Sequence, residues 1–176
     1  PMADEDGEIL WYDPDPRAIL PLDGFHMPQS LQRKVRKGGY EIRLNHSFPA
    51  VIRACAQPDV GRETTWISNE IIEVYIELHH LGYAHSVETW IEGECVGGLY
   101  GVAINGFFAG ESMFSQKRDT SKLALVYLVE HLQHQDFLLL DIQFLTEHLR
   151  RFGAVEISRE AYRQQLAKAI MLPVSF

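Results

Sequence analysis

Strand-forming apolar residues and glycines alternate in one stretch near the middle of the chain, residues 97–115, GGLYGVAINGFFAGESMFS. The dipeptide Asn105-Gly106 divides two apolar runs and favours a two-residue hairpin turn. Glycines inside a strand usually mark a bulge, or the close approach of another backbone or a ligand. The pattern therefore predicts an apolar β-hairpin that carries one carboxylate, Glu111. On pattern alone, a core hairpin with an exposed glutamate and the floor of a site both stay open.

Helical periodicity and capping residues predict most of the other elements. Thr146 and Ser158 each stand just before a helical segment, as N-caps do, and either Ser68 or Asn69 caps a third helix. Apolar residues over 121–134 form more than one stripe, so this long helix should be well buried. The predicted strands are 40–44, 84–91, the two hairpin arms, 137–143 and 155–157; the predicted helices are 31–37, 48–55, 69–81, 121–134, 146–151 and one that follows Ser158.

This order of elements predicts one α+β domain with a mixed, mostly antiparallel sheet flanked by helices, similar to an N-acyltransferase core. Residues 1–16 differ from the rest, since they are acidic and turn-rich, with two prolines that favour a boundary. We expect Trp11 and Tyr12 in this segment to cover an apolar surface of the main domain.

The net charge of −8 argues against binding nucleic acid through the overall field of the protein. One local exception is the basic cluster of Arg33, Lys34, Arg36 and Lys37, which could hold phosphates or form a solvated helix face. The two cysteines form no CxxC pair, and the histidines at 79, 80 and 85 lack ligand spacing, so we expect no metal. No apolar run approaches the roughly 20 residues of a membrane span.

Polar residues end the predicted strand 137–143, where alternation puts Asp141 and Gln143 on the same face about 7 Å apart. Together with Glu111 they could form a polar cluster beside an apolar pocket. No nucleophile elbow, Cys-His context, P-loop or GxGxxG is present. Direct attack by an amine is then the natural chemistry, with Gln143 accepting from the amine and Asp141 holding the amide or the ammonium. Spacing alone still favours an ordinary cap and loop contact for this Asp-x-Gln.

Several segments, in order along nearly the whole chain, closely resemble the leucyl/phenylalanyl-tRNA–protein transferase family. They are WYDPDPRAIL (11–20), TTWIS (64–68), LGYAHSVETW (81–90), the stretch 97–115, TSKLAL (120–125) and LLLDIQFLTEHL (138–149). The resemblance implies a bacterial, cytoplasmic, monomeric enzyme without a cofactor. It implies a GNAT-like domain over residues 16–176, with residues 1–15 the remnant of a small N-terminal domain. The implied reaction moves Leu, Phe or Met from aminoacyl-tRNA to proteins that start with Arg or Lys, which marks them for N-end-rule degradation.

The resemblance also assigns roles to individual residues. Asp141 and Gln143 match the catalytic pair, and Glu111 matches a carboxylate that holds the acceptor. Trp66 and Tyr75 match residues around the terminal adenosine, and the basic cluster at 33–37 matches the patch that grips the tRNA acceptor stem. The implied pocket for the donor side chain consists of Leu99, Phe108, Met113, Leu125 and Leu128.

Two positions depart from the family pattern, since Met2 and Leu128 stand where aromatic residues are expected. Two other functions also stay open. An acyl-CoA-dependent N-acetyltransferase of the GNAT type would need a glycine-rich loop before the long helix, and residues 116–120 contain no glycine. A non-catalytic RNA- or peptide-binding module on the same scaffold would bind aminoacyl-tRNA without transferring anything.

Overall fold

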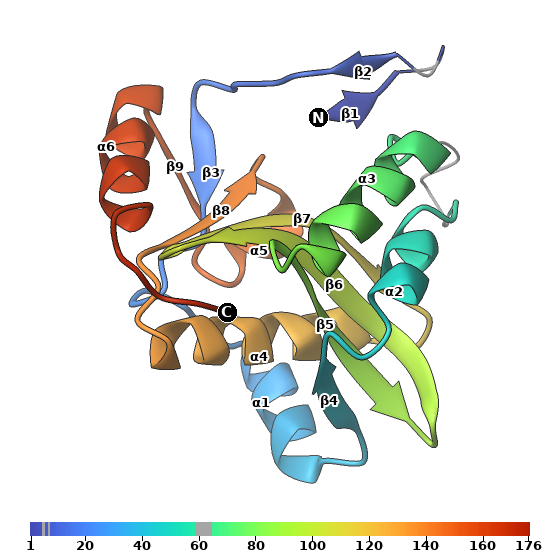
Figure 1. Ribbon diagram of the computed structural model, residues 1–176. Coiled ribbons are helices and arrows are strands. Elements are labelled where there is room, and N and C mark those ends of the chain that lie inside the picture. Colours follow the sequence, from blue (N-terminus) through green and yellow to red (C-terminus); the bar gives the residue numbers. More distant parts are fainter. Residues whose placement is uncertain (5, 7, 59–64) are drawn as a thin grey trace.

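A seven-stranded sheet runs through the computed structural model of the chain, with helices on both of its faces (Figure 1). The structure describes residues 1–4, 6, 8–58 and 65–176. The strands are β1 (Met2–Ala3), β2 (Ile9–Leu10), β3 (Arg17–Ile19), β4 (Glu41–Leu44), β5 (Ala84–Ile91), β6 (Glu94–Ile104), β7 (Phe107–Ser115), β8 (Leu139–Gln143) and β9 (Val155–Ile157). The helices are α1 (Gln29–Lys37), α2 (Phe48–Cys55), α3 (Asn69–His80), α4 (Thr120–His134), α5 (Glu147–Arg150) and α6 (Arg159–Ala169).

The main sheet has the strand order β4-β5-β6-β7-β8-β3-β9. Its neighbours pair antiparallel except β7 and β8, which are parallel and are connected through α4. A parallel pair needs such a crossover, and a helix is its usual form. The predicted fold class, α+β with a GNAT-like, mostly antiparallel sheet flanked by helices, is confirmed.

The predicted turns and caps are confirmed as well. β6 and β7 form the hairpin around Asn105-Gly106, and Ile104 pairs with Phe107 across the turn. The hydroxyl groups of Ser68, Thr146 and Ser158 accept from backbone N–H groups three residues further on, at 3.2–3.3 Å. These bonds satisfy donors that a helix N-terminus would otherwise leave without a partner.

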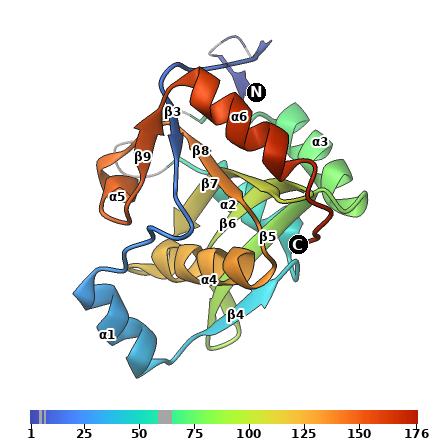
Figure 2. The ribbon, with the colours of Figure 1, turned by 90° about the vertical axis from the view of Figure 1, so that its left-hand side faces the viewer.

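Two apolar cores lie on opposite faces of the sheet. α4 covers one face (Figure 2). Its buried leucines and valines pack with Leu99, Phe108 and Leu140. α2 and α3 cover the other face, where Phe48, Ile71 and Tyr100 are buried. α6 packs on this second side against β3 and β8 through Tyr162 and Leu139. Leu140 of β8 thus belongs to the α4 core, whereas Leu139 packs in a smaller cluster with α6, and Asp141 lies on this α6 side.

The interior glycines of the hairpin make room for protein atoms. A side chain at Gly97 would collide with Thr120, and one at Gly101 would collide with the carbonyl oxygen of Ala109 and the ring of Phe108. A register shift between Tyr100 and Gly101 confirms a bulge there. The close approach predicted for Gly97 and Gly101 is therefore made by α4 and β7, whereas Gly110 has only the carbonyl oxygen of Asp141 nearby, at 3.6 Å.

The N-terminal segment differs most from the sequence predictions. The strand β3 was not expected, yet it pairs with both β8 and β9 in the sheet. β1 and β2 form a separate two-stranded sheet, attached where the N–H of Ala3 donates to the carbonyl oxygen of Trp66 at 3.0 Å (Figure 1). Trp11 is 82% exposed and Tyr12 is 50% exposed, so the prediction that they cover the main domain is wrong. The division of the chain at residue 15 stays a prediction.

Candidate active site

The site lies where the parallel strands β7 and β8 stop pairing. Their ladder runs from Phe107–Leu139 to Ala109–Asp141. Gly110 and Glu111 follow on β7, and Gln143 ends β8. Two cavities open at this point, of about 340 Å³ and about 300 Å³. Both are lined by Met2, Trp66, Glu111, Gln143 and Phe144, so these residues form the wall that the cavities share.

The larger cavity has an apolar interior that reaches towards α4. Leu99, Met113, Leu125 and Leu128 line it, and these are four of the five residues expected around the donor side chain. Phe108, the fifth, does not line it. Its ring is fully buried further along the same face, next to the ring of Phe176 at 5.4 Å between centroids. We therefore correct its assignment, because Phe108 pairs with Ala103 near the hairpin turn, beyond the bulge.

Asp141 is fully buried and accepts four hydrogen bonds. Arg17 donates through Nε to Oδ1 at 3.0 Å and through Nη2 to Oδ2 at 2.6 Å. The hydroxyl of Tyr162 donates to Oδ2 at 2.9 Å, and the backbone N–H of Gln143 donates to Oδ1 at 2.9 Å. A buried carboxylate is stable only with such partners, and the paired guanidinium is the strongest of them.

Gln143 does not continue the strand as alternation predicts. Its φ is 60°, in the left-handed region that residues other than glycine rarely adopt. The bond from its N–H to the Asp141 side chain two residues earlier is the local contact that favours such a turn. Its side-chain Nε2 donates to the carbonyl oxygen of Gly110 at 3.2 Å. The turn thus carries the amide of Gln143 to β7 and into the wall between the cavities.

Glu111 is a mostly buried carboxylate in that same wall. Burial raises its pKa above the ordinary value for a glutamate. Hydrogen bonds from Tyr75 and Gln143 lower it, while the charge of Asp141 raises it. Burial and the contact with Glu111 raise the pKa of Tyr75, whose hydroxyl donates to this carboxylate. A glutamate with a raised pKa suits proton transfer near neutral pH.

The two residues expected around the terminal adenosine have different positions. Trp66 lines both cavities. Tyr75 lines neither of them, and it lies in the α2–α3 core, with its ring 5.4 Å from that of Tyr100. The structure therefore places Tyr75 behind Glu111 rather than on a cavity surface, because α3 directs its hydroxyl to the carboxylate.

The expected basic cluster lies on α1, at the opposite end of the molecule from β1 and β2 in Figure 1. Arg33, Arg36 and Lys37 are exposed, and Lys34 donates to the backbone carbonyl of Arg118. That contact brings α1 next to the loop between β7 and α4, which adds the exposed cations Lys117 and Arg118 to the same surface.

Arg17 and Tyr162 are site residues that the sequence did not reveal. Nothing in the pattern distinguishes Arg17 from other arginines, and Tyr162 has the spacing of an ordinary apolar position on α6. One signal was available, since a carboxylate at the end of a buried strand needs a cationic partner. That rule predicts a partner but does not identify it.

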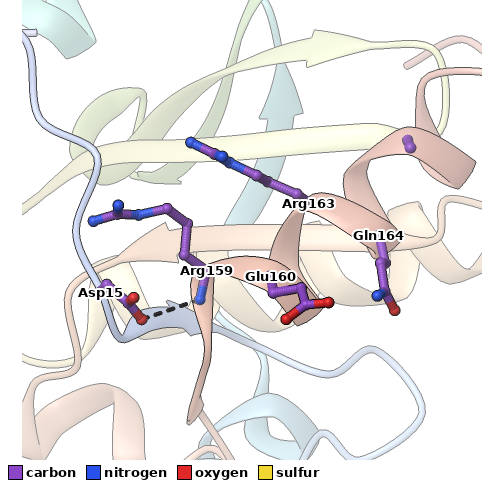
Figure 3. A pocket seen from close by; sticks show the side chains of 6 residues that line it. Asp15, Arg159, Glu160, Arg163 and Gln164 are labelled. Carbon is purple, nitrogen blue, oxygen red and sulfur yellow. Dashed lines mark hydrogen bonds between the residues drawn. The ribbon is translucent and has the colours of Figure 1, made fainter.

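Contacts between the segment before β3 and the helix α6 hold Arg17 in place. Asp13 forms ion pairs with Arg159 and Arg163 at 3.3 and 2.8 Å. Oδ1 of Asp15 accepts from the backbone N–H of Arg159 at 3.1 Å, beside a shallow pocket on α6 (Figure 3). These contacts join the two segments that supply Arg17 and Tyr162 to Asp141.

No group of three or more histidine, cysteine or acidic side chains within the described ranges could hold a metal ion. In the same part of the chain, no helix combines the length and apolarity needed to cross a membrane.

Comparison with known proteins identifies the family of this chain. A family model described as leucyl/phenylalanyl-tRNA protein transferase matches residues 19–167. The chain belongs to this family. A leucyl/phenylalanyl-tRNA–protein transferase of Herpetosiphon aurantiacus is 56% identical over 98% of this chain and 89% of its own length. One of Paramagnetospirillum magneticum is 52% identical over 97% of this chain and 82% of its own length. As a member of the leucyl/phenylalanyl-tRNA–protein transferase family, the protein is an aminoacyltransferase.

Among solved structures, that of L-PGS from Bacillus licheniformis is similar in fold to this member of the leucyl/phenylalanyl-tRNA–protein transferase family. The TM-score is 0.57, and the match covers 89% of this chain and 65% of that chain. Because only 13% of the residues are identical, this likeness concerns the fold alone.

Proposed function

We propose that this enzyme transfers Leu or Phe, and also Met, from aminoacyl-tRNA to the α-amine of proteins that start with Arg or Lys. The observation that carries the proposal is the pair of cavities that meet at Glu111 and Gln143. A reaction between two large substrates needs two sites that join where the new bond forms.

The donor side chain occupies the larger cavity in this proposal. Its leucines and Met113 offer an apolar surface that accepts Leu, Phe or Met and disfavours polar side chains. One methylene changes binding in such a pocket by only about 1–3 kcal/mol. We therefore expect several apolar donors to be used rather than one.

The acceptor amine enters through the smaller cavity. Glu111 lines it and supplies a negative charge for the cationic end of the acceptor. Asp141 also lines it, but its carboxylate is already paired with Arg17. Glu111 is therefore the carboxylate that is available to the incoming Arg or Lys.

The chemical step is an attack of the amine on the aminoacyl ester. An N–C bond forms to the carbonyl carbon, and the bond between this carbon and the 3′ oxygen of the terminal adenosine breaks. The amide oxygen of Gln143 accepts a hydrogen bond from the attacking amine and orients its lone pair. Glu111 takes the proton that the nitrogen loses, and that proton ends on the 3′ oxygen as a hydroxyl group.

The basic surface of α1 and the following loop binds the acceptor stem of the tRNA. Arg33, Lys34, Arg36 and Lys37 contribute, and Lys117 and Arg118 lie beside them. Phosphate contacts of this kind supply affinity that falls steeply with salt. A monomer in the cytoplasm suffices for this activity, whose products enter N-end-rule degradation.

Transfer of labelled Leu or Phe from charged tRNA to synthetic peptides tests the proposal. Peptides that start with Arg or Lys should become labelled at the α-amine, whereas matched peptides that start with Asp, or whose α-amine is acetylated, should not. Binding of charged tRNA without transfer would support a non-catalytic module instead. Acetyl transfer from acetyl-CoA to the same peptides would support the GNAT-type alternative.

A further inference from the structure

The carboxylate of Asp141 has no acceptor position left for a substrate. A carboxylate offers about four lone-pair sites. Arg17 occupies two of them, and Tyr162 and the N–H of Gln143 occupy the others, all at 2.6–3.0 Å. The side chain of Asp141 is 1% exposed and that of Arg17 is 13% exposed, so water does not compete strongly for these bonds. Protein donors thus fill the acceptor positions of Asp141, and none remains for a proton of the acceptor amine.

Among the contacts of Asp141, the hydrogen bond from the N–H of Gln143 is therefore the one through which it can affect the reaction. Oδ1 accepts from the N–H of Gln143 and favours the left-handed backbone at this residue. This conformation turns the chain at the end of β8 and brings the amide of Gln143 to Gly110. A displacement of the carboxylate would release the turn, and the amide would leave the wall between the cavities.

We propose that Arg17 and Tyr162 are positioning residues of the transfer reaction, which fix Asp141 so that it holds the Gln143 turn in place. This inference rests on the proposed function. Neither residue needs to touch the reacting atoms for this role. Together with Asp141 they form a clamp, called here the Arg17–Asp141–Tyr162 clamp, that acts on catalysis through Gln143.

Two further sets of contacts support the clamp. The guanidinium of Arg17 lies over the ring of Tyr162, 4.8 Å from its centroid, so the two donors also support each other. Their parent segments are joined a second time, because Asp13 forms ion pairs with Arg159 and Arg163. Asp15 also accepts from the backbone N–H of Arg159 (Figure 3). Donors attached to joined segments keep the direction of their hydrogen bonds, which is what a positioning role requires.

The test uses steady-state transfer of Leu from charged tRNA to an Arg-starting peptide, with kcat and KM measured for both substrates. The variants are Tyr162→Phe, Arg17→Lys, Arg17→Met, Asp141→Asn and the double variant Arg17→Met with Asp141→Asn. Matched controls are Tyr83→Phe and Arg53→Met, which change exposed residues outside both cavities. Thermal melting of each variant identifies any that fail to fold.

A misplacement of about 1 Å can cost about 100-fold in rate, so we expect kcat to fall about 10- to 100-fold in Arg17→Met and by a smaller factor in Tyr162→Phe. Arg17→Lys should recover part of the loss, and KM should change less than about threefold. The double variant should be no slower than Asp141→Asn alone, because Arg17 acts through Asp141.

Three results would overturn the inference. The first is a wild-type kcat in both folded Tyr162→Phe and folded Arg17→Lys. The second is a change in KM without a change in kcat. The third is a loss of kcat in the double variant that equals the product of the losses in the two single variants. If Arg17→Met does not fold, Tyr162→Phe and Arg17→Lys decide the question. An inactive wild type would instead count against the proposed function, so the two failures are distinguishable.

Discussion

The side-chain amide of Gln143 donates to the carbonyl oxygen of Gly110 at 3.2 Å, although 33 residues separate them in the chain. The bond connects the end of β8 to β7, beyond the last pair of their ladder at Ala109–Asp141. Because Glu111 follows Gly110 directly, the bond also sets the distance between the two polar side chains of the shared wall. Activity should therefore depend on the amide itself and not on side-chain volume alone.

Gln143→Glu tests that dependence with almost no change in shape. The new carboxylate cannot donate to Gly110, and its charge would repel both that carbonyl and Glu111. We expect transfer to fall at least about 10-fold while the tRNA dissociation constant stays near that of the wild type. Gln164→Glu on the exposed side of α6 is the matched control, and equal rates for the two variants would contradict a role for the amide.

Glu111→Gln should change the pH dependence of transfer. Glu111 must be ionised to accept a proton, and its raised pKa places its titration above that of an ordinary glutamate. In the wild type, activity should therefore fall with decreasing pH through both this pKa and that of the acceptor amine. The variant should be slower, and its activity should fall with decreasing pH only through the pKa of the acceptor amine. Glu77→Gln, an exposed change on α3, should keep the wild-type profile; an unchanged profile in Glu111→Gln would argue against proton transfer to Glu111.

The same variant should be more stable than the wild type at neutral pH. A carboxyl group whose folded pKa is raised contributes stability below its unfolded pKa, and this contribution is lost as pH rises through the folded pKa. Replacement of Glu111 by the neutral Gln removes this decrease in stability at high pH. Thermal melting should therefore show a higher Tm for Glu111→Gln at pH 7–8 and a smaller difference at pH 4, and a lower Tm at pH 7–8 would contradict the assigned direction of the shift.

Met113→Ala should alter the choice of donor. Met113 lines the larger cavity and is only partly buried, so its truncation enlarges the cavity with less damage to the core than a change at Leu125. We expect the ratio of kcat/KM for Phe over Leu to rise by up to about 10-fold. This is within the change in discrimination that one or two methylenes produce in an apolar pocket. Met171→Ala, at a 79% exposed position, is the control. An unchanged ratio would show that the donor side chain lies elsewhere.

Replacement of Arg33, Arg36 and Lys37 by Ala should weaken the binding of tRNA and flatten its salt dependence. Each phosphate contact contributes about 0.9 to the slope of log K against log salt, so the slope should decrease by up to about 2.7. Arg159→Ala and Arg163→Ala lie on α6 and provide cationic controls, which should leave that slope unchanged. If the α1 variant binds tRNA with the wild-type slope, α1 presents only a solvated face.

Local signals in the sequence were sufficient for most of the fold. Ser68, Thr146 and Ser158 cap helices as predicted, and Asn105-Gly106 forms the hairpin turn, because these residues act on backbone groups only a few positions away. The strand β3 was missed for the opposite reason. It has three residues, too few for a period, and tertiary pairing with β8 and β9 defines it.

The candidate site was predicted only in part, for a similar reason. Alternation along residues 137–143 correctly placed Asp141 in a polar cluster, but it assumed an extended Gln143. The left-handed turn depends on the carboxylate of Asp141, and this carboxylate is held by Arg17, 124 residues away in sequence. Contacts of such long range leave no mark on local spacing. Phe108 was misplaced for the same reason, since its ring lies beside Phe176, at the far end of the chain.

A crystal structure with a stable amide analogue of 3′-phenylalanyl-adenosine tests the account most directly. We predict that the phenyl ring lies in the cavity of Leu99, Met113, Leu125 and Leu128, and that the carbonyl carbon lies at the wall within reach of Gln143. The open side of that carbon should face the smaller cavity, next to Glu111. A phenyl ring in the smaller cavity, or a carbonyl remote from Gln143, would contradict the assignment of the two cavities.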